Sequence, residues 1–355
     1  MRVAITGAAG FIGSALCRHI LAAGGTEVHG IDRLTYAANP VTLTELRALQ
    51  GFIFHQTDIA DATAIRATIQ AIRPDAIIHL AAETHVDRSI DQTAPFIATN
   101  LGGTYNLLEA ALDLYRTASP AARARFRFLH ISTDEVYGSL GTTGAFSETS
   151  SFAPNSPYAA SKAGAEHLAR AWQNTYDLPV IITNCSNNYG PYQYPEKLIP
   201  HMILKALNGA PLPVYGRGAN VRDWLYVDDH AAALWLILQK GLPGEKYHIG
   251  GRQEMTNLAL VESLCDLLDT RMQDSALRPH KNLIRFVGDR PGHDFRYAMN
   301  IDKIGRELGW APAVPLAEGL ARTVDWYLAR QDWVCALETR YAGERLGLGK
   351  TPGHC

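Results

Sequence analysis

The sequence predicts an α/β protein, a doubly wound parallel sheet of the Rossmann type with a smaller C-terminal α/β lobe. Short apolar runs, such as residues 3–6 and 76–80, alternate with amphipathic helical patterns, as expected for buried parallel strands joined by crossover helices. A glycine-rich turn at residues 7–13 separates the first strand from the first helix, and Asp32 ends the second strand. Together these observations predict a dinucleotide-binding domain, because such a turn places a diphosphate against the helix N-terminus.

Composition and charge limit the classes of partner. Lys plus Arg total 33 against 35 for Asp plus Glu, so the net charge of −2 gives no general reason to expect nucleic acid or a membrane surface. The chain shows no signal-peptide pattern, and no apolar run approaches the roughly 20 residues of a membrane span. The five cysteines have no metal-binding spacing, so we expect a reduced, cytoplasmic compartment and no metal site.

The glycine turn has the spacing GxxGxxG over residues 7–13, which alone is equally typical of a tight turn with close helix packing. The second strand, residues 26–31, strengthens the cofactor interpretation because Asp32 follows it, about 20 residues after the last glycine. A carboxylate there accepts hydrogen bonds from the adenosine ribose and repels a 2′-phosphate, so NAD is expected in preference to NADP. Arg33 is an opposing observation, because an arginine at this strand end sometimes receives that phosphate.

The ends of the next strands add further cofactor contacts. Asp58, after the third strand at residues 52–54, is placed to flank the adenine; the alternative is a cap of the helix at residues 62–72, a role that Asp61 fits better. Small residues after the fourth strand let a cofactor approach closely. The expected cofactor-binding residues are Gly7, Gly10, Phe11, Ile12, Gly13, Asp32, Asp58, Ile59, Leu80, Ala81 and Ala82, together with Tyr158 and Lys162.

A hydroxyl and two acids follow the fifth strand, residues 126–131, in the stretch Ser132 to Gly138. Ligands of open α/β sheets bind beyond the carboxyl ends of the strands, so reacting groups are expected here. Asp134 and Glu135 would suit a general acid and a general base if their environments push their pKa values apart. From these residues alone, a helix cap or a solvated turn is the favoured alternative.

Tyr158 and Lys162 lie four residues apart, on one face of a helix that begins near Ser156. A phenol is too weak a base at neutral pH, and we expect the neighbouring ammonium to lower the pKa of Tyr158. Thr133 is placed to hydrogen-bond the same substrate oxygen. The pattern is common on exposed helix faces, but downstream of the glycine turn it predicts a hydride-transfer site.

The pattern changes after the sixth strand, residues 180–183, where a loop rich in turn residues leads to a helix at residues 197–207. Tyr215 offers a ring for a base to stack on, or is a half-buried strand residue; Arg222 offers a cation for a phosphate, or pairs with Asp223. Residues 246–249 are expected to return to the main sheet. The predicted division is residues 1–185 and 223–250 for the cofactor domain, 186–222 and 251–345 for the substrate lobe, and 346–355 for a tail.

These motifs resemble the extended short-chain dehydrogenase/reductase family over nearly the whole chain, and within it the 4,6-dehydratases of dTDP-glucose. The glycine turn, Asp32 and the Tyr158–Lys162 pair are shared across the family and do not select a reaction. The Asp134–Glu135 pair does, since related epimerases and decarboxylases have other residues there. Small departures are Ala38 in place of the usual glycine and Arg33 in place of the usual lysine. The narrower marks are residues 32–37, 85–89, 132–138, 187–191, 196–200 and 290–294.

The resemblance implies a cycle on tightly bound NAD that converts dTDP-glucose to dTDP-4-keto-6-deoxyglucose and water, a step of dTDP-rhamnose biosynthesis. Tyr158, supported by Lys162 and Thr133, takes the C4 hydroxyl proton as hydride leaves C4; Glu135 takes the C5 proton, and Asp134 protonates the departing C6 hydroxyl. It also implies a homodimer formed by the helix after Pro95 and the helix that carries Tyr158. The implied substrate-binding residues are Thr84, His85, Asn187, Lys197, Leu198, Pro213, Tyr215, Arg222, Asn257, Arg290 and His293.

Two other functions remain open from the sequence. One is another nucleotide-sugar enzyme, a 4-epimerase or a UDP-glucuronate decarboxylase, in which the two acids are incidental. The other is a catalytically silent NAD-binding regulator on the same fold. Retention of Thr133, Asp134, Glu135, Tyr158 and Lys162 argues against a silent protein, which has no chemical need for all five.

Overall fold

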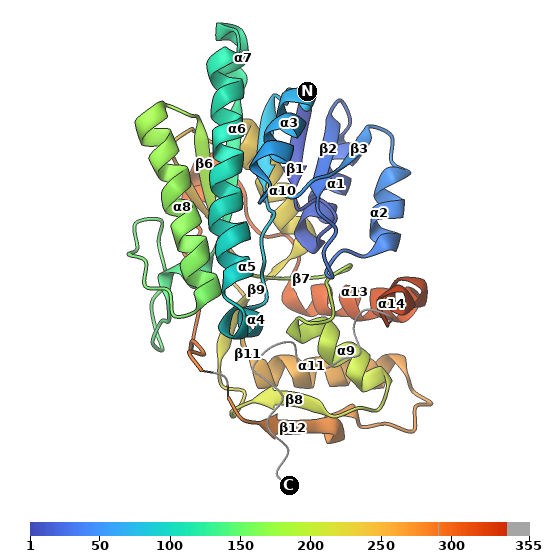
Figure 1. Ribbon diagram of the computed structural model, residues 1–355. Helices are drawn as coiled ribbons and strands as arrows, with labels where there is room; N and C mark the ends of the chain where they lie inside the picture. The colour runs from blue at the N-terminus through green and yellow to red at the C-terminus, as the bar shows by residue number, and fades with distance from the viewer. Residues whose placement is uncertain (290, 339–355) are drawn as a thin grey trace.

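The computed structural model describes residues 1–289 and 291–338, and it contains the predicted parallel sheet. Seven strands lie in the order β10-β6-β5-β4-β1-β2-β3, and every neighbouring pair is parallel (Figure 1). The strand order runs outward in opposite directions from the boundary between β1 and β4, and this switch point is the position where open α/β sheets bind ligands. The strands are β1 (Arg2–Thr6), β2 (Glu27–Asp32), β3 (Phe52–Gln56), β4 (Ala76–His79), β5 (Arg127–Thr133), β6 (Val180–Cys185) and β10 (Lys246–Ile249).

Helices cover both faces of this sheet because its strands are apolar on both sides. In β1, Val3 and Ile5 pack in one hydrophobic cluster and Ala4 in the opposite one, as the alternation of a strand requires. The first cluster includes side chains of α1 and α10, and the second includes those of α3, α6 and α8. These helices are α1 (Phe11–Ala23), α3 (Ala62–Ile72), α6 (Thr104–Thr117), α8 (Pro157–Tyr176) and α10 (Val227–Lys240), with α2 (Pro40–Arg47) and α12 (Asp302–Leu308) at the sides. The doubly wound fold is confirmed, including the return of residues 246–249 to the sheet.

The smaller lobe has its own hydrophobic core below the carboxyl ends of the main strands (Figure 1). It contains a three-stranded sheet, β11-β9-β7, and a two-stranded sheet, β12-β8. The elements are β7 (Asn187–Tyr189), β8 (Leu212–Tyr215), β9 (Val221–Tyr226), β11 (Glu254–Thr256), β12 (Ile284–Val287), α9 (Leu198–Leu207), α11 (Asn257–Arg271), η3 (His280–Leu283), α13 (Leu316–Ala329) and α14 (Gln331–Glu338). The predicted tail at residues 346–355 lies outside the described residues, and the division into two domains stays a prediction.

Residues 187–189 were expected in a loop and form the strand β7 instead. Their composition of turn residues is overridden because β7 pairs in parallel with β9, a strand far along the chain. This pairing orders the segment that enters the smaller lobe.

The helical region after Pro95 differs from the single helix expected there, because residues 97–103 form a π-helix between α5 and α6. In this wider turn the side chain of Asn100 bonds both backbone groups of Glu83, and its amide also donates to Ser161. The π-helix therefore ties the end of β4 to α8. The remaining short elements are α4 (Val86–Asp91), α5 (Ala94–Phe96), η1 (Ile97–Gly103), α7 (Pro120–Arg125) and η2 (Asp134–Tyr137).

Within the described part of the chain, no helix combines the length and the hydropathy needed to cross a membrane.

Candidate active site

Two adjoining cavities lie beyond the carboxyl ends of the main strands, and both are lined by Glu135, Asn187 and Lys197. The first runs from the glycine turn to α8 and the second extends into the smaller lobe. The first is lined by all the predicted cofactor and catalytic positions: Gly7, Gly10, Phe11, Ile12, Gly13, Asp32, Asp58, Ile59, Leu80, Ala81, Ala82, Thr133, Asp134, Glu135, Tyr158 and Lys162. The second is lined by the described substrate positions: Thr84, His85, Asn187, Lys197, Leu198, Pro213, Tyr215, Arg222, Asn257 and His293. Arg290 lies outside the described residues.

The glycine turn requires glycine for packing and leaves the start of α1 available. A Cβ on Gly13 would lie 2.1 Å from the carbonyl oxygen of Gly7, and Gly7 itself has a φ of +73°. Gly10 is the N-cap of α1 and offers no side chain to the first N–H groups of the helix. Those N–H groups and the helix dipole suit a diphosphate, so the turn fits a dinucleotide.

The adenosine end of the first cavity is rich in paired charges. Asp32 accepts the backbone N–H groups of Ala9 at 3.1 Å and Leu34 at 2.8 Å, and carboxylate lone pairs remain for ribose hydroxyls. Burial raises the pKa of Asp32, an effect that these hydrogen bonds oppose. The guanidinium of Arg33 bonds the carboxylates of Asp58 and Glu83. The capping alternative for Asp58 is answered by Asp61, which caps α3 as predicted by accepting two backbone N–H groups.

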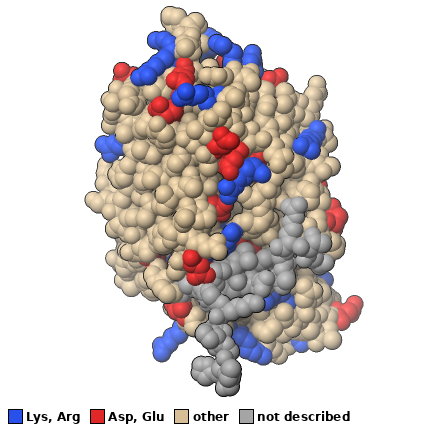
Figure 2. All heavy atoms as spheres, in the orientation of Figure 1, with Lys and Arg blue, Asp and Glu red and all other residues tan. Residues whose placement is uncertain are grey.

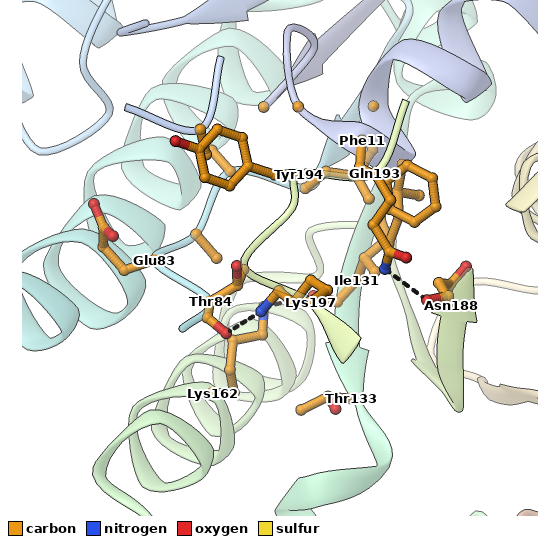
Figure 3. Close-up of a pocket in the computed structure, with 18 of the residues that line it drawn as sticks. Phe11, Glu83, Thr84, Ile131, Thr133, Lys162, Asn188, Gln193, Tyr194 and Lys197 are labelled. Carbon is orange, nitrogen blue, oxygen red and sulfur yellow. Dashed lines mark hydrogen bonds between the residues drawn. The ribbon is translucent and has the colours of Figure 1, made fainter. Parts of the chain in front are cut away.

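Tyr158 and Lys162 lie in the first two turns of α8, whose N-cap is the side chain of Ser156. Figure 3 shows Lys162 and Thr133 on the same side of the pocket. The ammonium of Lys162 donates to the carbonyl of Ile131 at 2.7 Å, and burial lowers its pKa to about 8.

The prediction that Lys162 lowers the pKa of Tyr158 is wrong. Burial raises that pKa well above its ordinary value, and the charges of Glu135 and Cys185 raise it further. The hydrogen bond with Thr133 opposes these effects. The phenol lies next to the threonine hydroxyl that was expected to share its substrate oxygen.

Asp134 and Glu135 occupy the first turn of η2, with Thr133 as the N-cap. The alternative of a helix cap or a solvated turn holds only in part: the acids lie in a turn, but Thr133 is its cap, and Asp134 is 2% exposed and not solvated. The Thr133 hydroxyl donates to one oxygen of Asp134 at 3.1 Å, and the other oxygen has no hydrogen-bond partner within residues 1–289 and 291–338. Burial, followed by the charge of Glu135, raises the pKa of Asp134 well above its ordinary value. The raised pKa favours the protonated form of Asp134, which suits proton donation.

The backbone before the turn that carries the two acids is held by a hydrogen bond from β6. Asn184 donates to the carbonyl of Thr133 at 3.1 Å and to Glu166 at 2.8 Å. Glu166 in turn forms a buried ion pair with Lys246 at 2.5 Å. This network fixes the backbone of Thr133 and so the direction in which Asp134 points.

Polar groups line the second cavity and reach across from both lobes. Lys197 donates to the carbonyl of Thr84 at 2.9 Å, a contact drawn in Figure 3. The Tyr215 hydroxyl donates to Asp87 at 3.2 Å. Tyr215 is half-buried at the end of β8, as its structural alternative proposed, yet it also lines the cavity.

The guanidinium of Arg222 lies 4.4 Å from the ring centre of Tyr297 and donates to the carbonyl of Asp294 at 3.0 Å. Among the described residues, the side-chain oxygens of Asn187 and Asn257 are buried without a hydrogen-bond partner. These amides leave donor and acceptor capacity for a polar ligand such as a sugar nucleotide.

Sequence reasoning missed several residues that line the cavities. Glu83 stands in the polar cluster after β4 and could have been selected for that position. Cys185, whose thiol pKa burial raises to about 12, and Tyr297 gave no motif signal. The lining residues missed include Glu83, Cys185, Glu196, Trp224 and Tyr297.

Comparisons with known proteins agree with this site. The family model described as GDP-mannose 4,6 dehydratase matches residues 4–323. The dTDP-glucose 4,6-dehydratase of Neisseria meningitidis serogroup B is 51% identical over 353 residues, covering 98% of this chain and 99% of the relative.

Two solved structures share the fold. The dTDP-glucose 4,6-dehydratase of Streptomyces venezuelae, with NAD and dTDP bound, is 46% identical with a TM-score of 0.84, covering 94% of this chain and 98% of that one. The UDP-glucuronic acid 4-epimerase of Bacillus cereus is 30% identical with a TM-score of 0.79, covering 93% of this chain and 99% of that one. The chain therefore belongs to the nucleotide-sugar 4,6-dehydratase family of the extended short-chain dehydrogenases/reductases.

Proposed function

We propose that this protein is an NAD-dependent dTDP-glucose 4,6-dehydratase that converts dTDP-D-glucose to dTDP-4-keto-6-deoxy-D-glucose and water. The observation that carries the proposal is the pair Asp134 and Glu135 beside Tyr158. Elimination of water needs an acid for the leaving hydroxyl and a base for the C5 proton, and burial next to a second carboxyl group raises the pKa of Asp134 and so favours its protonated form. An epimerase needs no such pair.

The residues of the first cavity divide the proton transfers among them. Tyr158, as the phenolate that Lys162 and the positive charge of a bound nicotinamide would stabilise, accepts the proton of the C4 hydroxyl, and Thr133 hydrogen-bonds that oxygen. The 4-keto group makes the C5 proton acidic, and Glu135 removes it. Asp134 then gives its proton to the C6 hydroxyl, which leaves as water, and a proton returns to C5 as the cycle closes.

The glycine turn, Asp32 and Asp58 are proposed to hold NAD. When bound, the nicotinamide supplies a hydride acceptor for C4, a positive charge beside the phenol and later a hydride donor for C6, with no net redox change. Support comes from the open N-terminus of α1 and from relatives solved with NAD. The ammonium of Lys162 is held by its hydrogen bond to the Ile131 carbonyl and is proposed to stabilise the side of the site that faces the ribose.

The second cavity is proposed to hold the nucleotide diphosphate. Tyr215 and Pro213 would pack on thymine, and Arg222, Lys197 and Asn257 would contact the phosphates. The cation of Arg222, which lines this cavity, supports this assignment. Arg290, which lies outside the described residues, is proposed to join them.

The test is to incubate the protein with dTDP-glucose, and separately with UDP-glucose and with UDP-glucuronate, and to determine the product mass. The proposal expects loss of one water from dTDP-glucose. An unchanged mass with inverted C4 stereochemistry would identify an epimerase, loss of carbon dioxide from UDP-glucuronate would identify a decarboxylase, and an unaltered substrate would identify a silent regulator.

We also propose a homodimer that pairs η1, α6 and α8 with their copies. Ile97, Tyr105 and Tyr176 are 45%, 46% and 40% exposed on these helices, which are large values for apolar side chains. Trp172 contacts both tyrosine rings. In Figure 2 the area over α6 and α8 is largely free of charged side chains. A Tyr105→Glu variant would elute as a monomer in light-scattering chromatography.

A cytoplasmic location is proposed from the free thiols of Cys17, Cys185 and Cys265, which are buried and unpaired in the described structure. The proposed product has a methyl group at C6 and a ketone at C4, which is the chemistry needed to make a 6-deoxyhexose. A place in dTDP-rhamnose biosynthesis is proposed on that basis.

A further inference from the structure

An arginine at the end of β2 is held by two acids that come from other strands. Arg33 follows Asp32, lines the first cavity and is one-third exposed. One of its terminal nitrogens lies 3.2 Å from Asp58, which follows β3, and the other bonds Glu83, which follows β4. The three side chains therefore form an ion-pair cluster at the adenosine end of the cavity.

This position is where dinucleotide-binding domains select between NAD and NADP. An arginine beside the ribose is the group that accepts the 2′-phosphate in NADP-binding proteins. A guanidinium binds phosphate through two parallel N–H groups, and in this protein those groups already face carboxylates. With Asp32 included, the local charge is one cation against three carboxylates, which repels a phosphate dianion.

Glu83 is the firmer of the two contacts. Its residue is 7% exposed, whereas the Asp58 side chain is 35% exposed. Its backbone N–H donates to Asn100 at 2.8 Å, and its carbonyl accepts from the same amide at 3.0 Å. Figure 3 shows Glu83 on the side of the pocket away from Thr133, so its carboxylate is removed from the chemical step.

We infer that Glu83, with Asp58, withholds Arg33 from the ribose 2′ position and is a second determinant of NAD selectivity behind Asp32. This inference rests on the proposed use of a nicotinamide cofactor. Asp32 excludes the 2′-phosphate by its charge and by bonding the ribose hydroxyls. Glu83 occupies the guanidinium of Arg33, which would otherwise bind the phosphate if Asp32 were replaced.

The test is a double-mutant cycle on Asp32→Asn and Glu83→Gln, read as the nucleotide bound. Each holoenzyme is incubated with equal, excess NAD and NADP, separated from free nucleotide, denatured and analysed by mass spectrometry. Wild type and Glu83→Gln should carry NAD, and Asp32→Asn should gain a small NADP fraction. The double variant should show an NADP to NAD ratio about ten times larger than the product of the single effects.

Two controls isolate the cause. Adding Arg33→Ala to the double variant should return the ratio to that of Asp32→Asn. Glu196→Gln removes another buried carboxylate from the same cavity, one that pairs with Lys197 at 3.6 Å, and should show no coupling with Asp32→Asn.

The inference is wrong if the NADP to NAD ratio of the double variant changes only by the product of the two single effects. It is also wrong if the increase in that ratio persists after Arg33→Ala. If Glu83→Gln does not fold, the same cycle with Asp58→Asn should show coupling in the same direction, and its absence counts equally against the idea. The readout does not depend on turnover. A failure to dehydrate dTDP-glucose would thus contradict the proposed function, and an uncoupled cycle would contradict only this inference.

Discussion

Carboxylates at the two ends of one cavity are in opposite situations. At the adenosine end, Asp58 and Glu83 share the cation of Arg33. At the catalytic end, Asp134 is bonded by the neutral hydroxyl of Thr133, and burial raises its pKa well above the ordinary value. The same functional group is thus paired with a cation in one place and has a strongly raised pKa in the other. The bonding partner of each carboxylate and its access to water decide between these two situations, because desolvation disfavours a charge that no cation compensates.

The largest effect is expected from Tyr158→Phe, which removes the proposed proton acceptor from the catalytic end of the cavity and leaves the other end intact. Turnover of dTDP-glucose should fall by about 10³- to 10⁴-fold. Reduced nicotinamide should not form on mixing, which near-ultraviolet absorbance would detect. NAD content should equal that of wild type. Near-normal turnover would remove Tyr158 from the oxidation step.

Glu135→Gln should separate oxidation from elimination. The C4 oxidation needs Tyr158 and not Glu135, so bound reduced nicotinamide should accumulate after substrate is added, while release of product falls by about 10²- to 10³-fold. Wild-type turnover in this variant would refute Glu135 as the C5 base. Glu148→Gln, a change outside both cavities, is the matched control and should behave as wild type.

Asp134→Asn should affect activity and stability in opposite directions. Elimination should slow by about 10²-fold, with solvent exchange at C5 faster than water loss. Because the native pKa of Asp134 is raised, the native state keeps a proton that the unfolded chain releases above about pH 4, so this carboxyl costs more stability as pH rises. Asparagine has no such cost. The melting temperature of the variant should therefore exceed that of wild type by more at about pH 8 than at about pH 4; a constant difference would contradict the raised pKa.

The smallest effect is expected from Asp58→Asn. Its ion pair with Arg33 is partly exposed, and Glu83 still holds the guanidinium, so unfolding at saturating NAD should lose about 0.5 kcal/mol. High salt should shrink that loss because exposed charges are screened, whereas the pH-dependent gain of Asp134→Asn should survive it. Denaturant unfolding of both variants at two salt concentrations measures these two changes in stability. A salt-independent loss would mean that Asp58 acts through packing or through the cofactor and not through its charge.

Local patterns were sufficient for most elements of the fold. The apolar runs predicted the strands of the main sheet, and the glycine turn predicted the start of α1, because both signals are contained in a few consecutive residues. Asp61 was recognised as a cap for the same reason. The strand β7 was missed because Asn187–Tyr189 becomes a strand only by pairing with β9. The π-helix was missed because Asn100 reaches Glu83 and Ser161, both distant in sequence.

Prediction of the site from the sequence was limited in the same way. Motifs located Tyr158, Lys162, Thr133, Asp134 and Glu135, and the fold brings them to one cavity. The shifts of their pKa values depend on burial, which no spacing reveals; the pKa of Tyr158 is raised, and not lowered as expected, because burial and the neighbouring charge of Glu135 disfavour the phenolate.

The residues alone were sufficient to predict the parallel sheet and the cofactor turn, and the resemblance selected the two acids that are proposed to distinguish dehydration from simple redox chemistry. Only the tertiary structure decided how those groups are charged. Arg33, which the sequence left as an argument for NADP, is matched with Asp58 and Glu83. Asp134, for which its own stretch of residues favoured a helix cap or a solvated turn, is buried, and burial raises its pKa. The physical reason is common to both: a charge is set by what surrounds it in space, and those neighbours come from strands that are far apart in the chain.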